Sequence, residues 1–202
     1  MKYAFAIISA LILCLVIYLA QAFSEYREVQ FRVYDVENKY ALTQEGADLM
    51  IVDFSRFGCD HCRKLHPVLK EAIERDGKIR YMPRLVTFDK VWDETLATSV
   101  YAAAEQGKFV EMHHAIFKNW PVESRKKLYQ TAASIELNIE KFDQDLKDPE
   151  IIDRMREDQK YFESWMLSRT PSILVGKSMI FQPMDKETTV EELLEKFNEI
   201  RK

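Results

Sequence analysis

The spacing of apolar positions along the chain changes several times, and each change marks a predicted element. A short apolar run at 49–54 is rich in strand-forming residues and precedes Gly58, which indicates a strand that leads into a turn. From residue 62 onward the spacing becomes helical, and the pattern ends at Asp76-Gly77. The apolar face of this predicted helix consists of Leu65, Val68, Leu69, Ala72 and Ile73.

A second strand and a long helical block follow. The run at 79–88 is typical of a strand, although Pro83 removes one backbone donor and indicates a strand end or a bulge. From 92 to 168 the apolar period is helical throughout. Within this block we expect helices at 123–137 and at 150–167.

Two strands and a helix close the chain. Residues 172–175 and 178–181 are short apolar runs on either side of Gly176, which predicts two adjacent strands. Thr188 and Glu191 then have the spacing of a capping box at the start of an amphipathic helix. The apolar face of that helix consists of Val190, Leu193, Leu194, Phe197 and Ile200.

The order of these elements predicts one α/β domain over residues 49–202, with a helical insertion at about 91–168. No repeat and no Pro- or Ser-rich linker separates the helical block from the strands around it, so we expect an insertion rather than a second domain. Residues 23–48 form an N-terminal extension that supplies either a short stalk or an edge strand. The candidate strand residues are Tyr26, Val29, Phe31 and Val33.

The first 22 residues differ sharply from the rest. Lys2 precedes an uncharged apolar run from Tyr3 to Leu19, and Ala20-Gln21-Ala22 follows it, which is the pattern of a secretory signal peptide cleaved after Ala22. An uncleaved membrane anchor is the alternative, because the run approaches the length that spans a bilayer. Either version delivers the rest of the chain outside the cytoplasm. We therefore expect a periplasmic protein, soluble after cleavage or anchored to the inner membrane.

Composition and charge indicate a globular protein and argue against a nucleic-acid partner. The 202 residues suit a single domain, and 47% apolar with 31% charged residues is typical of a globular chain. The net charge is −4, and the basic residues are interspersed with acidic ones. The chain therefore carries no basic footprint for nucleic acid.

The cysteines carry the candidate chemistry. Cys14 lies in the N-terminal apolar run as apolar filler, and only Cys59 and Cys62 remain in the predicted domain. Cysteines three positions apart close too small a loop to brace a fold, so this pair serves redox chemistry or metal binding. A thiol at a helix start meets unpaired N–H groups and the positive end of the helix dipole, which makes Cys59 the candidate nucleophile. Cys62, one turn further in, is the candidate resolving thiol.

The stretch 52–62 resembles the active-site segment of the thioredoxin superfamily, and the helical insertion resembles the DsbA-like family within it. The matching features are the CxxC pair at a helix start, Asp53 six residues before it, Pro67 five residues after it, and Thr170-Pro171 before a late strand. The resemblance implies a thioredoxin fold with an inserted helical subdomain. It also implies a thiol:disulfide oxidoreductase, without cofactor or metal, that acts on exported polypeptides and is recycled by a membrane redox partner.

The same resemblance implies roles for individual residues. Asp53 would be the buried acid that exchanges protons with the second cysteine, and burial would raise its pKa. Thr170-Pro171 would form a cis-proline loop that faces the CxxC pair and presents backbone to an extended substrate. Threonine before that proline resembles the isomerase-like members, so oxidation and isomerisation both stay open.

The two residues between the cysteines act in opposite directions. His61 adds a positive charge beside the thiolate and resembles the histidine of DsbA-like oxidases. Asp60 departs from the proline that is common there, and its charge would offset part of the helix-terminus effect of about 0.3–1 kcal/mol. We expect Cys59 to be rich in thiolate near neutral pH but less acidic than in a strongly oxidising DsbA.

Two other functions remain as alternatives. In a periplasmic metal-binding module, Cys59 and Cys62 would hold Cu(I) or Zn(II) together with His61 or His66. A thioredoxin-like adaptor with incidental thiols fits poorly with the matched Asp53 and the two matched prolines.

The remaining histidines are expected to have structural roles. His113 falls on the apolar face of its predicted helix and should be a core residue, whereas His114 should point to solvent. His66 should pack or form a hydrogen bond near the site. The aromatic stripe of Phe109, Phe117 and Trp120 is expected to belong to the core.

Overall fold

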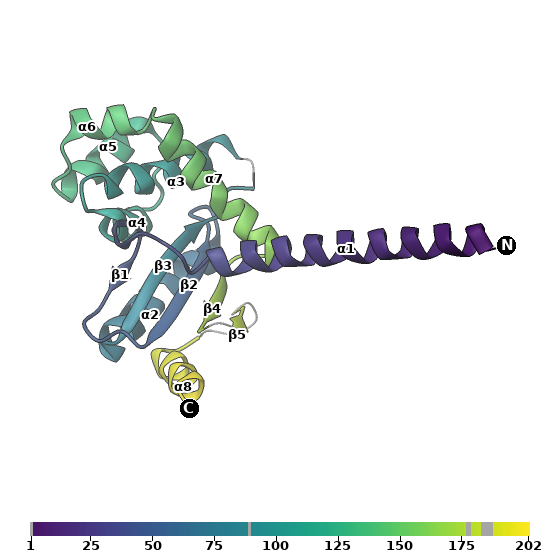
Figure 1. The fold of residues 1–202 in the computed structure, drawn as a ribbon. Coiled ribbons are helices and arrows are strands. Elements are labelled where there is room, and N and C mark those ends of the chain that lie inside the picture. Colours follow the sequence, from purple (N-terminus) through teal and green to yellow (C-terminus); the bar gives the residue numbers. More distant parts are fainter. Residues whose placement is uncertain (1, 89, 177–178, 183–187) are drawn as a thin grey trace.

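The computed structural model describes residues 2–88, 90–176, 179–182 and 188–202. Within these residues, five strands form one sheet in the order β1-β3-β2-β4-β5 (Figure 1). The central pair β2 and β3 is parallel, and the other neighbours are antiparallel. The strands are β1 (Leu42–Thr43), β2 (Leu49–Ser55), β3 (Ile79–Leu85), β4 (Ser172–Val175) and β5 (Met179–Phe181).

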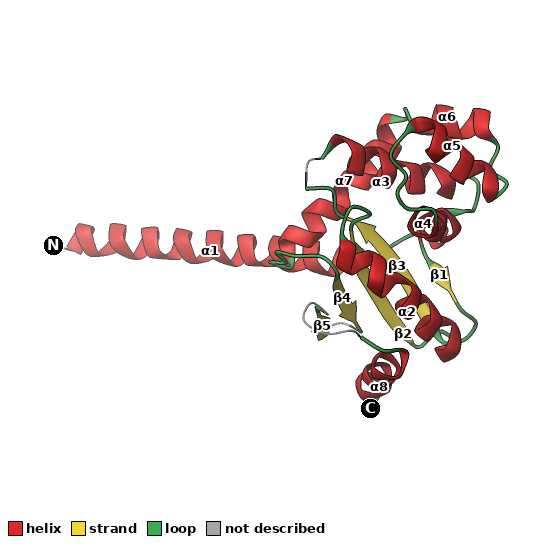
Figure 2. Ribbon diagram, turned by 180° about the vertical axis from the view of Figure 1, so that it is seen from behind, coloured by secondary structure: helices red, strands yellow, loops and turns green. Residues whose placement is uncertain are grey.

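Helices cover the sheet and form a separate layer at one end of it (Figure 2). Helix α2 lies across one face of the sheet and packs against α8, while α3 to α7 gather beyond the ends of β2 and β3. Helix α1 projects away from the body of the molecule. The helices are α1 (Lys2–Arg32), α2 (Asp60–Asp76), α3 (Val91–Ala104), α4 (Phe109–Lys118), α5 (Arg125–Ser134), α6 (Ile139–Asp145), α7 (Pro149–Ser164) and α8 (Val190–Ile200), with a 3₁₀ turn at Asn38–Tyr40.

The central elements follow the apolar pattern of the sequence. The predicted strands at 49–54 and 172–175 correspond to β2 and β4, and the strand predicted at 79–88 is β3, which ends at Leu85 and contains Pro83 in its interior. Of the strand predicted at 178–181, Ser178 lies outside the described residues, and the rest is β5. Helix α2 ends at Gly77, whose φ of 74° is the left-handed conformation that glycine adopts without steric cost.

The capping box of the last helix is shifted by one residue from the prediction. The side chain of Thr189 accepts from the backbone N–H of Glu192, whose carboxylate accepts in turn from the backbone N–H of Thr189. Both adjacent threonines have the capping-box spacing, but Glu191 is engaged in an ion pair with Arg75 of α2. The capping box therefore consists of Thr189 and Glu192 rather than Thr188 and Glu191.

The predicted edge strand at residues 26–33 is wrong. Residues up to Arg32 continue α1, and the edge strand is β1. A helical path brings Gln30 against the end of α7, where its side chain donates to the carbonyl of Ser164 and its carbonyl accepts from the indole of Trp165. These two hydrogen bonds join the end of α1 to the end of α7.

The N-terminal helix runs without a break through the predicted cleavage position after Ala22. Among the described residues, no helix meets both the length and the hydropathy needed to cross a membrane. The signal peptide and the membrane anchor both stay predictions.

A buried ion pair joins the helical block to the sheet. Arg84 of β3 donates to Asp158 of α7 at 3.1 Å, and both side chains are almost fully buried. The Asp158 carboxylate also accepts from the hydroxyl of Tyr101 at 2.6 Å and from the backbone N–H of Leu85 at 2.7 Å. Three elements distant in sequence therefore meet at one buried charge pair.

Candidate active site around Cys59 and Cys62

The CxxC pair occupies the junction between β2 and α2. Cys59 is the N-cap of α2, and its sulfur accepts from the backbone N–H of Cys62 at 3.3 Å. Both cysteines carry free thiols and are buried, with Cys62 the less exposed of the two, at 3% against 9%. The structure thus places Cys59 as the outer thiol and Cys62 as the inner thiol at the start of α2.

The surroundings of Cys59 stabilise its thiolate. The Cys62 thiol, as a hydrogen-bond donor, makes the largest contribution and lowers the pKa of Cys59; burial opposes it, and the backbone N–H groups of Cys62 and His61 lower the pKa further, to about 5. The pKa of Cys62 is raised above its usual range, chiefly by burial and then by the nearby Cys59. The two thiols therefore differ in charge at neutral pH, and Cys59 is the thiolate.

Residues 170 and 171 bring a loop from across the sheet to the nucleophile. The Thr170–Pro171 peptide bond is cis, as the resemblance implied. The Cys59 sulfur lies 3.3 Å from the backbone carbonyl oxygen of Thr170, to which Cys59 donates a hydrogen bond when its thiol is protonated. Because Pro171 leads directly into β4, which pairs antiparallel with β2, the sheet fixes this loop against the start of α2.

Asp53 is buried in β2, as predicted. One of its carboxylate oxygens accepts from the hydroxyl of Tyr81 at 2.9 Å, while the other, Oδ1, has no partner among the described residues. Burial raises the pKa of Asp53 to about 7, and the Tyr81 hydrogen bond only partly opposes this effect. A carboxyl group with such a pKa is present in both protonation states near neutral pH and is suited to proton exchange.

The two residues between the cysteines lie at the surface. His61 and Asp60 are both exposed in the first turn of α2. Asp60 forms an ion pair with Arg63, one turn further along, and the Arg63 guanidinium lies over the ring of Trp120 at 5.0 Å. This pairing reduces the effect that the Asp60 charge has on the thiolate.

Sequence reasoning missed two features near the site. Tyr81 reaches Asp53 because β3 pairs with β2 in a register that sets Ile51 opposite Tyr81. Asp93 forms an ion pair with Arg56 at 3.6 Å, and its carboxylate lies so close to Gly58 that a Cβ there would come within 3.3 Å of it. The spacing of residues along the chain does not reveal the Tyr81–Asp53 contact, since that contact depends on strand register. For the close approach of Asp93, the glycine at position 58, directly before the CxxC pair, was the available signal.

The histidines depart in part from prediction. His113 is fully buried, as expected, and its Nε2 lies 3.5 Å from the hydroxyl of Ser55. His114 was expected to point to solvent, which is wrong, because its Nδ1 lies 3.0 Å from Nε2 of His66. The apolar period alone did not reveal that α2 packs against this side of α4.

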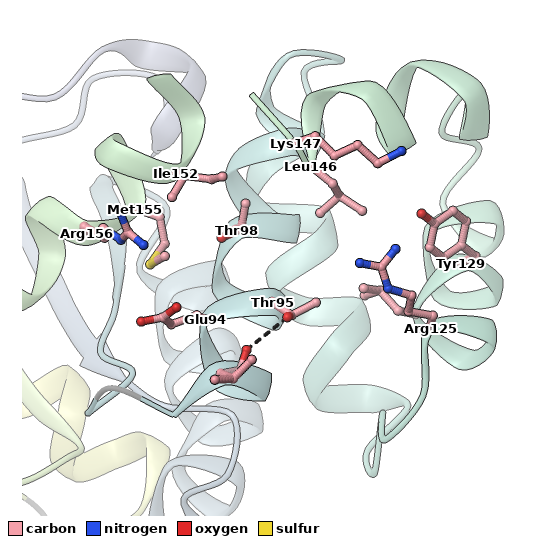
Figure 3. A pocket seen from close by; sticks show the side chains of 12 residues that line it. Glu94, Thr95, Thr98, Arg125, Tyr129, Leu146, Lys147, Ile152, Met155 and Arg156 are labelled. Carbon is pink, nitrogen blue, oxygen red and sulfur yellow. Dashed lines mark hydrogen bonds between the residues drawn. The ribbon is translucent and has the colours of Figure 1, made fainter. Parts of the chain in front are cut away.

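A cavity of about 200 Å³ lies away from the CxxC pair, between α3, α5 and α7 (Figure 3). Its lining combines Arg125, Tyr129 and Arg156 with Leu146, Ile152 and Met155. None of the sequence-predicted site residues lines it. The cavity therefore belongs to the helical insertion rather than to the candidate active site.

The chain belongs to the thioredoxin family, because a thioredoxin family model matches residues 36–196. The curated relatives that it matches include the Na⁺/H⁺ antiporters NhaA 1 of Mycolicibacterium gilvum, 25% identical over 80% of this chain and 27% of the relative, and NhaA 3 of Salinispora tropica, 26% identical over 64% and 20%. The chain therefore spans about a quarter of the length of these curated relatives.

Solved structures confirm the predicted DsbA-like thioredoxin fold. The thiol-disulfide exchange protein alpha-DsbA2 of Wolbachia pipientis superposes with a TM-score of 0.71 at 19% identity, covering 88% of this chain and 98% of that one. The catalytic domain of Proteus mirabilis ScsC also gives 0.71, at 13% identity and 87% and 96% coverage. A thioredoxin-like oxidoreductase of Silicibacter pomeroyi DSS-3 gives 0.68, at 18% identity and 80% and 91% coverage.

Proposed function

We propose that this protein is a thiol:disulfide oxidoreductase in which Cys59 is the nucleophile and Cys62 the resolving thiol. The observation that carries the proposal is the pairing of an outer cysteine whose pKa is lowered to about 5 with an inner cysteine whose pKa is raised. Only a thiolate attacks a disulfide, so this asymmetry makes the outer sulfur reactive and keeps the inner one protonated until it is needed.

The exchange proceeds through one covalent intermediate. With a disulfide substrate, the Cys59 thiolate attacks one sulfur, a mixed disulfide forms, and the other substrate sulfur leaves as a thiolate. Cys62 then loses its proton and attacks Cys59, which releases the second substrate thiolate and leaves the Cys59–Cys62 disulfide. The same steps in reverse donate the disulfide to a reduced substrate. Asp53, with a pKa of about 7, accepts and returns the Cys62 proton.

The cis-proline loop is the proposed docking point for substrate. Thr170 presents its backbone carbonyl to the Cys59 thiol at 3.3 Å, so an extended polypeptide on this loop would bring its own sulfur to Cys59. We infer that the substrates are exported polypeptides and that a membrane redox partner recycles the CxxC pair outside the cytoplasm. The N-terminal signal pattern supports this location, as does the fold shared with a periplasmic thioredoxin-like protein of Salmonella enterica.

The direction of exchange follows from the stability of the thiolate. Lowering the pKa of Cys59 from 9.0 to about 5 stabilises the reduced form at pH 7 by about 3 kcal/mol, which makes a two-electron couple more oxidising by about 60 mV. We therefore expect a disulfide donor, an oxidase or an isomerase, rather than a reductase.

The deciding experiment is a titration of the Cys59–Cys62 pair against glutathione. We expect a reduction potential between about −210 mV and about −120 mV, the latter being the value of DsbA. A value of about −250 mV or lower would indicate a pair that is kept reduced, as in thioredoxin. Failure to form any intramolecular disulfide would defeat the proposed function.

Replacement of Asp53 by asparagine tests the proton exchange. The variant is expected to resolve the mixed disulfide roughly 100-fold more slowly or worse, because the Cys62 proton loses its acceptor. The rate is measured by rapid quenching and mass spectrometry of the intermediate. Asp35→Asn, at an exposed position, is the control and should react as the parent does.

The same variant should be more stable than the parent at pH 8. The unfolded Asp53 ionises near its ordinary pKa, while the native carboxyl holds its proton up to about pH 7, so native stability falls as the pH rises between these values. Asparagine removes this cost, which amounts to about 4 kcal/mol at most, and the gain should vanish near pH 3. Urea unfolding at the two pH values measures it, and an equal effect at both would contradict a raised pKa of Asp53.

A further inference from the structure

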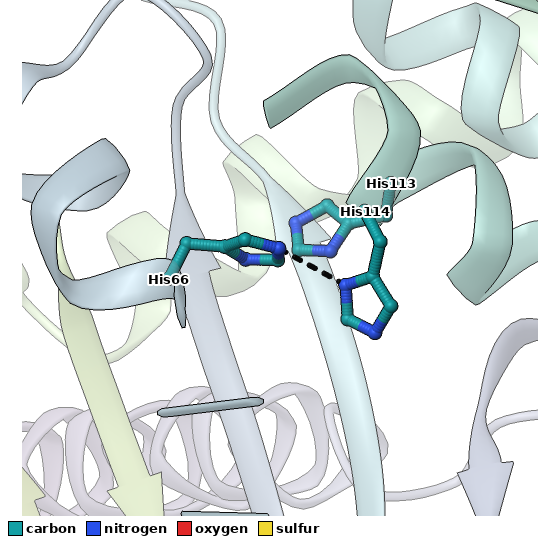
Figure 4. A group of neighbouring side chains, drawn as sticks. All are labelled: His66, His113 and His114. Atoms are coloured by element: carbon teal, nitrogen blue, oxygen red, sulfur yellow. Dashed lines mark hydrogen bonds between the residues drawn. The ribbon is translucent and has the colours of Figure 1, made fainter. Parts of the chain in front are cut away.

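Three of the four histidines meet in one cluster between α2 and α4 (Figure 4). His66 comes from α2, one turn beyond Cys62, and His113 and His114 are neighbours on α4. Each ring offers one nitrogen to the cluster, and these three nitrogens lie within 4.8 Å of one another. Two of the rings are in direct contact, with Nε2 of His66 3.0 Å from Nδ1 of His114.

The cluster is enclosed by aromatic rings. Phe117 stacks on His66 at 4.4 Å between ring centroids, and Phe57 and Tyr81 lie 5.7 and 6.3 Å from the ring of His113. His113 and His66 are buried, and His114 is partly buried. An apolar shell of this kind excludes competing water from a bound ion.

One nitrogen in this enclosure lacks a partner. Nδ1 of the fully buried His113 has no hydrogen bond with any described residue. Leaving a buried polar atom unpaired costs about 1–3 kcal/mol, and such atoms are few in native proteins. Packing alone therefore does not account for the cluster.

The surroundings of the three histidines also favour their uncharged form. Burial is the main cause that lowers the pKa of His66 to about 3 and of His114 to about 4, and the Lys70 ammonium adds to both effects. Burial likewise lowers the pKa of His113. Neutral imidazoles keep a lone pair free for a cation at neutral pH.

We propose that His66, His113 and His114 bind a divalent cation of the zinc class. Imidazole nitrogens suit zinc and its neighbours in the first transition row, and three histidine ligands with an open fourth position form a known type of zinc site. A zinc ion with Zn–N bonds of about 2.0–2.1 Å holds its ligand nitrogens about 3.3 Å apart, so nitrogens that now lie within 4.8 Å of one another would adjust to this spacing on binding. No cysteine belongs to the cluster, which makes this site distinct from the CxxC pair.

A bound ion would tie the CxxC helix α2 to α4 of the helical insertion. Since the ion would bind only the folded chain, zinc should raise the melting temperature of the protein. The site differs from the metal site considered from the sequence, which used the two cysteines.

The test uses the full chain carrying Cys59→Ser and Cys62→Ser, so that no active-site thiolate competes for metal and the result is independent of the proposed redox function. After chelation and dialysis, Zn²⁺ is titrated into it by calorimetry, and Co²⁺ is titrated as a spectroscopic probe. We expect one equivalent of Zn²⁺ per chain, a visible Co²⁺ spectrum of tetrahedral nitrogen coordination, and a higher melting temperature with zinc. No binding by this parent would overturn the proposal.

Two histidine variants in the same background locate the site. Loss of a residue that only forms a hydrogen bond to a metal ligand weakens metal binding by roughly 10–100-fold. His114→Gln removes a proposed ligand itself and should weaken Zn²⁺ binding by more than this. His61→Gln, at an exposed position, should bind Zn²⁺ as the parent does. Circular dichroism without metal checks that each variant is folded. The Co²⁺ spectrum of the parent reports nitrogen ligation in a chain with all its histidines, so this readout does not depend on the folding of a histidine variant. Unchanged binding in His114→Gln, or equal losses in both variants, would exclude the cluster as the site.

Discussion

A Cys62→Ser variant is expected to stop disulfide exchange halfway, as a covalent complex between Cys59 and its substrate. Cys62 donates to the Cys59 sulfur through its backbone N–H at 3.3 Å and is 3% exposed, so in the proposed mechanism it is the thiol that attacks the mixed disulfide. Such intramolecular attack corresponds to an effective thiol concentration of about 10⁵ M or more, which no external thiol replaces. Release of substrate should therefore slow by several orders of magnitude.

The trapped complex is measured with a peptide disulfide as substrate. Mass spectrometry under non-reducing conditions should show one peptide half attached to the Cys62→Ser chain, and a reducing agent should remove it. The matched control is the double variant Cys59→Ser/Cys62→Ser, which should form no complex. If Cys62→Ser released product at the parent rate, or if Cys59→Ser alone still exchanged disulfides, the assigned order of the two thiols would be wrong.

Removal of the Asp158 carboxylate is expected to have the largest effect on stability. An Asp158→Ala variant leaves the buried Arg84 guanidinium without its counter-ion and takes away the acceptor of Tyr101 and of the Leu85 N–H. Breaking a buried ion pair by removing one partner costs about 3–5 kcal/mol. This loss is a large part of the stability of about 5–15 kcal/mol that is typical of a domain, so the variant should unfold at much lower urea concentrations.

The control comes from the same helix. Asp153 of α7 forms an ion pair with Arg156 at 3.7 Å, but its side chain is 79% exposed. Exposed pairs contribute about 0–1 kcal/mol, so Asp153→Ala should unfold almost as the parent does. Urea unfolding of both variants, followed by tryptophan fluorescence, measures the difference. Equal midpoints would mean that the Arg84–Asp158 pair does not hold the helical block to the sheet.

Much of the candidate site was visible in the sequence because its chemistry is local. The CxxC pair lies between a predicted strand and a helical apolar period, which placed it at a helix start, and the structure has Cys59 as the N-cap. Asp53 lies in one predicted strand and Thr170-Pro171 directly precedes another, and the structure places both near Cys59. The family model over residues 36–196 confirms the fold that this pattern predicted.

The errors lie where residues make contacts with distant elements. The residues at 26–33 include strand-forming side chains, but α1 continues through Arg32 because its last turns dock on α7. The capping box uses Thr189 and Glu192, while the predicted Glu191 pairs with Arg75 of another helix. In each case a residue makes a contact with a distant element that the short-range pattern does not reveal.

The sequence by itself determined which cysteine is the candidate nucleophile, where the helix that carries the CxxC pair begins and which strands form the core, since these depend on spacing and apolar period. Only the tertiary structure decided the partners across elements: Tyr81 beside Asp53, and the three histidines of α2 and α4 in one enclosure. Such contacts depend on strand register and helix packing, which bring together residues tens of positions apart. No short-range pattern predicts these contacts, because strand register and helix packing depend on many side chains at once.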